Sequence, residues 1–376
     1  MEIILIIGTI ESAFLFLLIM GKKDKRLADW TLALIFLLYT LSIGLTGLET
    51  LNANRNFPSP FIINLSWLIL FLQGPALWLY VKSLTNPDFQ LKPVYLLHLI
   101  PFLYFLVFHY FDFIRLPGPE KIAMAETELF KDKFSYKFSV AAIGLLTTGY
   151  NILALILIRD YQKKLKLNFS YIEHISLNWL RILVISSIIV YLVNSSLFIT
   201  DMFFPIATYR YLMLITYSFA TVYIFILGYF GLQQGNVFVN NTVNPEKGTR
   251  SRLPHSPGDK AQPKEPVFLN NLLVYMERNQ PYLDPEITIS KLSDSLKVKP
   301  EYLSEVLNQD LGQNFFDFIN KYRIEEFKIQ ALDQNNRHLS ITGIAHNCGF
   351  NSKAAFYRAF KKFENTTPTT YMSASH

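Results

Sequence analysis

The sequence predicts an all-α protein in which a seven-helix transmembrane bundle is followed by a soluble all-helical domain with two helix-turn-helix units. Three observations support this fold class. Hydrophobic residues make up 51% of the 376 residues and charged residues only 17%, against about 25% in an average soluble protein. The first 232 residues contain 32 charged side chains, as do the last 144, so the front part of the chain is the more apolar. From Val267 onward, apolar residues recur at the spacing of soluble amphipathic helices.

The amino-acid composition excludes several classes of protein. Its 57 aromatic residues and abundant aliphatic side chains exclude an intrinsically disordered or collagen-like chain. The single cysteine, Cys348, excludes an internal disulfide framework and a zinc site made of several thiolates. We therefore expect Cys348 to be a packed, reduced thiol, and we expect no cofactor and no metal.

Seven apolar stretches can each cross the hydrocarbon layer of a membrane, which is about 30 Å thick and needs about 20 helical residues. Helices are expected there because every backbone polar group must find a partner within its own segment. Trp30, Trp78 and Trp179 lie near the ends of the stretches, as is typical at membrane interfaces. The stretches cover residues 2–20, 27–48, 61–81, 94–113, 138–158, 177–200 and 207–232.

Lysine and arginine residues in the loops indicate the orientation of the spans. A secretory signal peptide is the competing interpretation of residues 1–20, but no basic residue precedes this apolar run and no small-residue cleavage site follows it. The loops on one side hold ten Lys and Arg residues, and the loops on the other side hold five. We therefore expect the N-terminus outside the membrane and the C-terminus in the cytoplasm.

Polar residues within the apolar stretches are candidates for an intramembrane sensor site, because ionisable groups in hydrocarbon are costly and often functional. A salt bridge from Glu11 to Arg181 or to a histidine is one arrangement that would stabilise them. The alternative is that they only tie helices together through hydrogen bonds, and that Arg181 extends to the cytoplasmic surface. Pro75 and Pro101 predict kinks in their helices. The sensor candidates are Glu11, His98, His109, Asn151, Arg181 and Asn194.

The chain divides by composition into a transmembrane domain at residues 1–232, a linker at 233–266 and a C-terminal domain at 267–376. The linker contains five prolines and three glycines and cannot bury an apolar face. We expect a flexible tether with a root-mean-square span of about 30–35 Å. Such a tether cannot transmit a rotation, so control is expected through pairing of two copies, masking of the C-terminal domain against the bundle, or proteolytic release.

The C-terminal domain contains two helix, turn, helix patterns around one longer helix. Apolar residues at i, i+3, i+4 and i+7 from Phe315 predict the long helix, which continues to about Leu332. The two helix-turn-helix units cover about residues 289–309 and 341–362. Pro300 fits the first position of the second helix in the first unit, and Ser352 is a suitable N-cap for its counterpart in the second unit.

A set of residues in and after the second unit fits a known family pattern: Ile344, Ala345, Gly349, Phe350, Ser352, Phe356, Arg358, Phe360, Lys361, Lys362, Thr367 and Pro368. On these residues the chain resembles the AraC-type family of bacterial transcription regulators, over roughly residues 267–372. The resemblance implies two helix-turn-helix units joined by a long helix, with both recognition helices in successive major-groove segments on one face of DNA. By its organisation alone, the multi-spanning front part resembles membrane-bound regulators of this family.

Some capping positions depart from the family pattern. Lys299 stands where the family usually has a capping serine. Gly343 stands where a capping box begun by Ser340 would place an acidic residue, so that cap is expected to be weaker. Asn365 replaces a usual glycine, which is tolerable because asparagine enters left-handed backbone conformations more easily than most residues.

Charge also distinguishes the two units. Glu305 and Asn308 stand where the family often has basic residues. Residues 267–336 carry a net charge of −4 and residues 337–376 a net charge of +4. Because neutralisation of phosphates supplies much of DNA affinity, the second unit is the expected anchor on the DNA backbone.

The exposed faces of the two recognition helices are the expected DNA contact set, with a merely solvated helix face as the alternative. Side chains near the start of such a helix reach base edges, where Lys or Arg suits guanine and an alanine methyl group suits the thymine methyl. Phe356, Phe360 and Phe363 are expected on the buried face of the second recognition helix. The contact set is Lys299, Glu301, Tyr302, Ser304, Glu305, Asn308, Ser352, Lys353, Ala354, Tyr357, Arg358, Lys361 and Lys362.

These features predict a one-component transcription regulator rather than an enzyme. The sequence has no H-E-x-x-H pair, no G-x-G-x-x-G after a strand and no P-loop. We expect a multi-pass protein of the bacterial inner membrane whose partners are double-stranded DNA, the lipid bilayer, a second copy in a homodimer, and an unknown signal ligand or partner protein. The rivals are a transporter or integral membrane enzyme with a regulatory C-terminal domain, and a protein-interaction module without DNA contact.

Overall fold

The computed structural model describes residues 2–173, 175–204, 206–240 and 265–375. These residues belong to two compact units. The first consists of Met1–Arg159 with Leu177–Asn241, and the second of Asp160–Ser176 with Thr242–His376. The described part is helical, without a strand, and its one β-type pairing is an isolated bridge.

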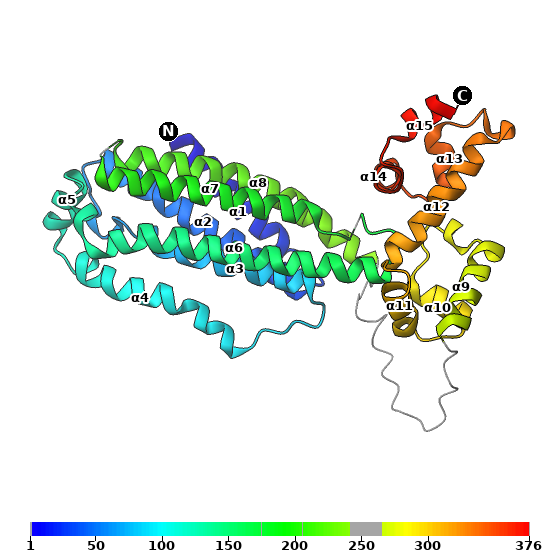
Figure 1. Ribbon diagram of the computed structural model, residues 1–376. Helices are drawn as coiled ribbons and strands as arrows, with labels where there is room; N and C mark the ends of the chain where they lie inside the picture. The colour runs from blue at the N-terminus through cyan, green and yellow to red at the C-terminus, as the bar shows by residue number, and fades with distance from the viewer. Residues whose placement is uncertain (1, 174, 205, 241–264, 376) are drawn as a thin grey trace, which may run out of the picture. The chain divides into compact units, whose positions relative to one another are not determined.

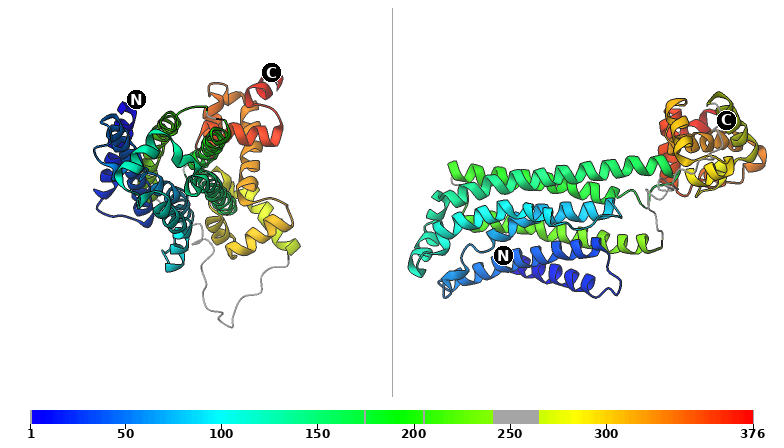
Figure 2. Two further views of the ribbon diagram at one scale, coloured as in Figure 1. Left: turned by 90° about the vertical axis from the view of Figure 1, so that its left-hand side faces the viewer. Right: turned by 90° about the horizontal axis from the view of Figure 1, so that it is seen from below.

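The first unit is a bundle of seven helical segments, each long and apolar enough to span a membrane. This confirms the expected fold class for the front part of the chain. Figures 1 and 2 show the long helices running side by side along the bundle. The segments are α1 (Glu2–Met20), α2 (Leu27–Asn54), α3 (Trp67–Thr85), α4 (Ile100–His109) with its flanking turns, α6 (Phe134–Asn168, whose residues from 160 onward belong to the second unit), α7 (Asn178–Phe203) and α8 (Tyr209–Asn240).

The helices of the bundle pack closely, and their outer faces are apolar. Helix α1 packs against α2 and α8, and α7 against α8. Gly8 permits the close approach of α1 to α8, since a Cβ atom there would lie 2.4 Å from Thr221 Oγ1. On the outside, Leu145 and Ile182 are 76% and 67% exposed. An exposed apolar surface of this kind suits contact with hydrocarbon or another apolar partner.

The fourth segment differs from the single kinked helix expected around Pro101. It consists of a 3₁₀ helix at Pro93–Leu99, then α4, then a π-helical turn at Tyr110–Ile114. Pro101 lies in the first turn of α4, where its missing N–H costs no helical hydrogen bond, so it begins a helix rather than kinking one. Pro75, by contrast, lies inside α3 as expected.

The boundaries of the linker also differ from the expectation. Helix α8 continues to Asn240, so residues 233–240 are helical rather than part of a flexible tether. Helix α9 begins at Glu265. The rest of the expected linker, residues 241–264, lies outside the described residues. The loop expected at 114–136 contains α5 (Gly118–Glu126) and a 3₁₀ turn at Leu129–Asp132.

The second unit contains the two expected helix-turn-helix units on either side of one long helix. Its apolar core is divided into two clusters, and residues of the long helix α12 belong to both. The helices are α9 (Glu265–Asn279), α10 (Ile289–Leu296), α11 (Pro300–Gln309), α12 (Phe315–Leu332), α13 (Ile341–Asn347), α14 (Lys353–Glu364) and α15 (Pro368–Ser375).

The predicted capping residues explain where the helices of the second unit start and stop. Ser352 Oγ accepts a hydrogen bond of 3.1 Å from Ala355 N and caps α14. Ser340 Oγ accepts one from Gly343 N, without the reciprocal bond that an acidic residue would add. Asn365 ends α14 with φ +55°, which confirms the expected left-handed conformation.

The division into units adds a segment that the sequence did not assign to the C-terminal domain. Residues 160–176, between the fifth and sixth apolar stretches, belong to the second unit by their contacts. The expected domain boundary at residue 232 therefore assigns most of the chain to the correct unit, but it places residues 160–176 in the wrong one.

Candidate nucleic-acid interface

The recognition helix of the second unit, α14, has one buried face and one basic face. Phe356 and Phe360 are fully buried against Phe327 of α12, and Phe363 is half-buried. The opposite face carries the exposed side chains of the predicted contact set, which are Lys353, Ala354, Arg358, Lys361 and Lys362, beside the half-buried Ser352 and Tyr357. Amphipathic spacing thus places the cations together on one side of a helix that is anchored from behind.

Contacts within the unit hold several of these side chains in place. Lys353 Nζ lies 5.4 Å from the centre of the Tyr357 ring. Lys362 Nζ pairs with Asp317 Oδ1 of α12 at 2.6 Å. Arg358 and Ser352 both contact the carboxylate of Glu173, which belongs to the 160–176 segment. Lys361 remains an exposed cation near the end of the same face.

The recognition helix of the first unit, α11, has a less basic outer face. Leu303, Val306 and Leu307 are buried, as its periodicity requires. Lys299 occupies the N-cap without a side-chain capping bond, and Glu301, Glu305 and Asn308 are exposed. Ser304 is half-buried.

Two predicted contact residues of α11 are already engaged inside the domain. Tyr302 packs its ring 5.0 Å from that of Phe268 in α9, so it helps to build the core of the first unit. Asn308 Nδ2 donates to the Ser304 carbonyl oxygen at 2.6 Å. Glu301 and Glu305 are exposed on the outer face of this helix.

Arg323 ties the long helix to the chain segment before the first helix-turn-helix unit and lies over the Phe350 ring of the second, a role that no sequence pattern indicates. It lies on α12 and is 1% exposed. Its Nε donates to the Tyr282 carbonyl oxygen at 2.7 Å, and its Nη2 to the Asp284 carbonyl oxygen at 2.8 Å. Burial lowers its pKa to about 10. The planar guanidinium presents several N–H donors in a fixed geometry, so it can bond to both carbonyl oxygens at once. The single ammonium group of a lysine could not do this with the same geometry.

Gly349 makes the turn between α13 and α14 possible. Its φ is +90°, and a Cβ atom would lie 2.5 Å from the Tyr282 carbonyl oxygen. Only glycine meets both conditions without strain. The turn, the carbonyl group of Tyr282 and the guanidinium of Arg323 therefore form one junction behind the recognition helix.

A family model described as a helix-turn-helix domain matches residues 292–374. This range contains α11 to α14, the long helix and the basic face. The C-terminal region is an AraC-type helix-turn-helix domain.

Several curated relatives also match part of this chain. Helix-turn-helix-type transcriptional regulators of Staphylococcus aureus strains COL and MSSA476 are each 34% identical over 103 residues, which is 27% of this chain and 13% of theirs. The regulator YtdP of Bacillus subtilis is 26% identical over 88 residues, which is 23% of this chain and 11% of that one. The matches thus cover only about an eighth of the curated relatives' length.

A solved structure of a protein of unknown function from Listeria innocua also matches. It is 26% identical and covers 28% of this chain and 95% of that chain, with a TM-score of 0.25.

The intramembrane candidates lie at separate places in the bundle rather than in one cluster. His98 Nδ1 is 2.7 Å from the Tyr150 hydroxyl oxygen, and its ring meets that of Trp78 edge to face. His109 is 1% exposed and stacks on Phe105. No group of three metal-ligating side chains occurs among the described residues.

The other four candidates show the same dispersion. Asn151 Nδ2 donates to Ser187 Oγ at 3.0 Å, which ties α6 to α7. Arg181 is exposed on α7. Glu11 is half-buried, and its Oε1 has no hydrogen-bond partner within the described part of the chain. The salt bridge considered for Glu11 and Arg181 is therefore not formed there, whereas Asn194 lines a cavity.

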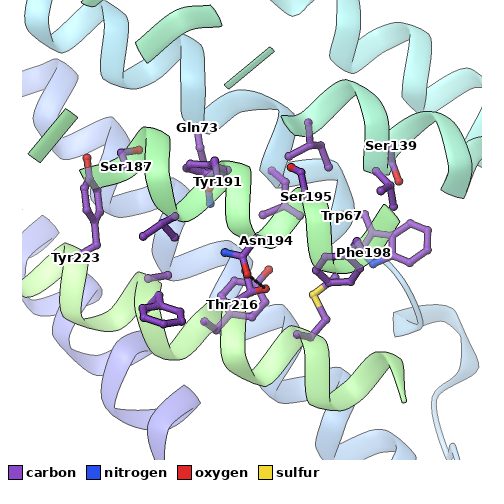
Figure 3. Close-up of a pocket in the computed structure, with 18 of the residues that line it drawn as sticks. Trp67, Gln73, Ser139, Ser187, Tyr191, Asn194, Ser195, Phe198, Thr216 and Tyr223 are labelled. Carbon is purple, nitrogen blue, oxygen red and sulfur yellow. Dashed lines mark hydrogen bonds between the residues drawn. The ribbon is translucent and has the colours of Figure 1, made fainter. Parts of the chain in front are cut away.

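This cavity lies inside the bundle and has a volume of about 110 Å³. Its walls are mostly apolar and aromatic, with a few polar groups (Figure 3). Tyr191 OH donates to Gln73 Oε1 at 2.7 Å, and Thr216 Oγ1 to Asn194 Oδ1 at 3.2 Å. The hydroxyl of Tyr136, 2% exposed, has no hydrogen-bond partner within the described residues. The cavity suits a small apolar molecule with one hydrogen-bonding group.

A wider pocket of about 600 Å³ lies at the end of the bundle where α2 ends and α8 begins, within the usual size of about 300–1,000 Å³ for ligand sites. Its wall includes Glu49, Glu126 and Glu128, with Arg210 as a cation. Sequence reasoning missed Glu49, because α2 extends beyond the expected span end at residue 48. It also missed Gln73, an uncharged amide inside an apolar stretch, which a search for every polar residue in the spans would have found.

Proposed function

We propose that the protein is a membrane-tethered one-component transcription regulator that binds specific DNA sequences through both helix-turn-helix units. The observation that carries this proposal is the basic face of α14, backed by a core that α12 shares between the two units. Phosphate contacts from such a face would position the domain, and base-edge contacts would select the sequence. The regulator names of the relatives are in keeping with this activity and with the prediction that the chain is not an enzyme.

The membrane location rests on the seven apolar segments and the apolar side chains on their outer faces. The excess of loop cations on one side favours a multi-pass protein of the bacterial inner membrane, with the N-terminus outside and the AraC-type domain in the cytoplasm. In this orientation the 600 Å³ pocket lies at the outer end of the bundle.

The bundle would act as the sensor. Two internal spaces of different character support this role: the mostly apolar cavity around Asn194, and the acidic pocket around Glu49. A signal ligand changes activity only if it binds two states of the bundle with different affinity. Of the six sensor candidates, only Asn194 lines one of these two spaces, the 110 Å³ cavity.

Selection from a pool of random double-stranded DNA tests the proposal on the full-length protein in detergent micelles. We expect a recurring sequence to be enriched, with binding that weakens steeply as salt is added. Enrichment of no sequence, with no salt-dependent retention of DNA, would remove the DNA-binding function and leave the protein-interaction module as the better explanation.

The sensor role has a separate test. Ser139→Leu fills part of the 110 Å³ cavity, whereas Ser196→Leu changes an exposed position on α7. We expect the first variant to abolish condition-dependent changes in target transcription while DNA retention stays as in the wild type. Equal behaviour of the two variants would argue against a role of the cavity.

A further inference from the structure

The segment between α6 and α7 is docked onto the AraC-type domain at several points. Phe169 forms an antiparallel bridge with Thr288, the N-cap of the first helix of the first unit. The neighbouring Ser170 is 2% exposed, and its Oγ donates to the Ile287 carbonyl oxygen at 2.8 Å. Arg323 Nη2 lies 3.3 Å from the same Oγ. These contacts bind the segment to the junction on which both helix-turn-helix units depend.

Glu173, further along the segment, reaches the start of the second recognition helix. Its Oε2 accepts a hydrogen bond from Ser352 Oγ, and its Oε1 pairs with Arg358 Nη2. The Tyr171 side chain also hydrogen-bonds to Ser352. The side chain of Glu173 is only 21% exposed, although Arg358 is 66% exposed. A carboxylate therefore lies at a helix N-terminus between a hydroxyl donor and a guanidinium.

This is the arrangement by which a DNA-binding helix holds a phosphate group. Anions are stabilised at helix N-termini because free backbone N–H groups and the helix dipole meet there. Serine hydroxyls and arginines make many of the phosphate contacts in protein–DNA complexes. A glutamate in that place uses the same donors, so the carboxylate and a DNA phosphate compete for them.

We propose that residues 169–173 form an autoinhibitory segment whose Glu173 occupies the phosphate site of the second recognition helix until a signal withdraws it. The inference rests on the proposed DNA-binding function. The occupant of the site is a segment of the same chain, whereas the masking expected from the sequence was against the bundle. Helices α6 and α7 flank the segment in the chain, so a signal can reach the domain without passing through residues 241–264.

The test measures binding of the full-length protein, in detergent micelles, to a 30-base-pair duplex of random sequence. Glu173→Gln keeps the size of the side chain and removes its charge. We expect affinity to rise about tenfold, within the usual range of coupling between sites, with a slope of log affinity against log salt that steepens by about one phosphate contact. Asp160→Asn removes an exposed carboxylate of the same 160–176 segment and serves as the matched control.

Unchanged or weaker binding by Glu173→Gln would overturn the proposal, because the segment would then be neutral or helpful to DNA. An equal rise in Asp160→Asn would also overturn it, since net charge alone would explain the effect. Hydrogen exchange at residues 353–357 without DNA gives a second reading: the Gln variant should exchange faster. If no variant binds the duplex, the proposed function fails, and unchanged exchange would then reject the docking as well.

Discussion

Arg323 Nε donates a hydrogen bond of 2.7 Å to the carbonyl oxygen of Tyr282 and so joins the long central helix to the chain segment that enters the first helix-turn-helix unit. The same guanidinium contacts the carbonyl oxygen of Asp284 and lies 5.7 Å from the centre of the Phe350 ring in the second unit. One buried cation therefore serves three parts of the AraC-type domain.

Replacing this arginine should destabilise the domain. Arg323→Met keeps an apolar stem but leaves two buried carbonyl oxygens without their donors, at a cost of about 2–4 kcal/mol in the free energy of unfolding. Arg323→Lys should recover only part of this loss, because one ammonium cannot replace the fork. Urea unfolding of the full-length protein, monitored by a spectroscopic signal from the C-terminal domain, gives the free energy of unfolding of both variants. Lys321→Ala, on the exposed face of the same helix, should be close to neutral.

The basic face of α14 should supply affinity for DNA of any sequence. Arg358→Ala and Lys361→Ala each remove an exposed cation from that face. If each contacts one phosphate, the slope of log affinity against log salt should fall by about 0.9 per substitution. Filter binding of the enriched duplex at several salt concentrations gives the slopes. A protein-interaction module would show no such change.

Cys348 should report unfolding of the second helix-turn-helix unit. The thiol is fully buried in the core of that unit, and burial raises its pKa to about 12. Maleimide at pH 8 should label it only after the domain opens, whereas Asn347→Cys provides an exposed thiol next to it in the chain. Rapid labelling of Cys348 in the native protein would contradict the packing described for α13.

The same thiol predicts a dependence of stability on pH. Its pKa in the folded protein lies above the ordinary value of 9.0. Its contribution to stability is therefore complete below about pH 9 and is lost as the pH rises toward about 12. Cys348→Ala should flatten this fall. Because burial also raises the pKa of Tyr282 to about 12, a smaller decline should persist in the variant.

Asn365 offers a test of the turn after α14. With φ at +55°, a residue with an ordinary Cβ atom is strained, and Asn365→Ala should cost about 1 kcal/mol. Asn365→Gly should be neutral or slightly stabilising, because glycine has no such strain. Thermal unfolding of the two variants shows whether each substitution raises or lowers the stability of the domain.

Features that depend on neighbouring residues in the chain could be predicted from the sequence, whereas features that depend on distant residues could not. The seven apolar segments, the caps at Ser340 and Ser352 and the buried phenylalanines of α14 follow from composition and periodicity. The role of Arg323 depends on carbonyl groups some forty positions away, which no pattern reveals. Tyr302 faces outward by periodicity but packs on Phe268 because α9 lies beside it.

The contact of the 160–176 segment with the recognition helix could not be predicted from the sequence. Phe169, Ser170 and Glu173 are ordinary loop residues in sequence, without a recurring spacing. Their placement comes from long-range contacts to Thr288, Arg323 and Ser352.

Helix α12 contributes to the cores of both halves of the AraC-type domain, and these halves have opposite net charge, so the domain is asymmetric. One copy would therefore bind its operator in a single orientation, with the cationic second half over a fixed end of the site. Inverting that site on the chromosome would turn the whole domain around relative to the promoter, so the outcome for transcription should depend on operator polarity as well as on operator sequence.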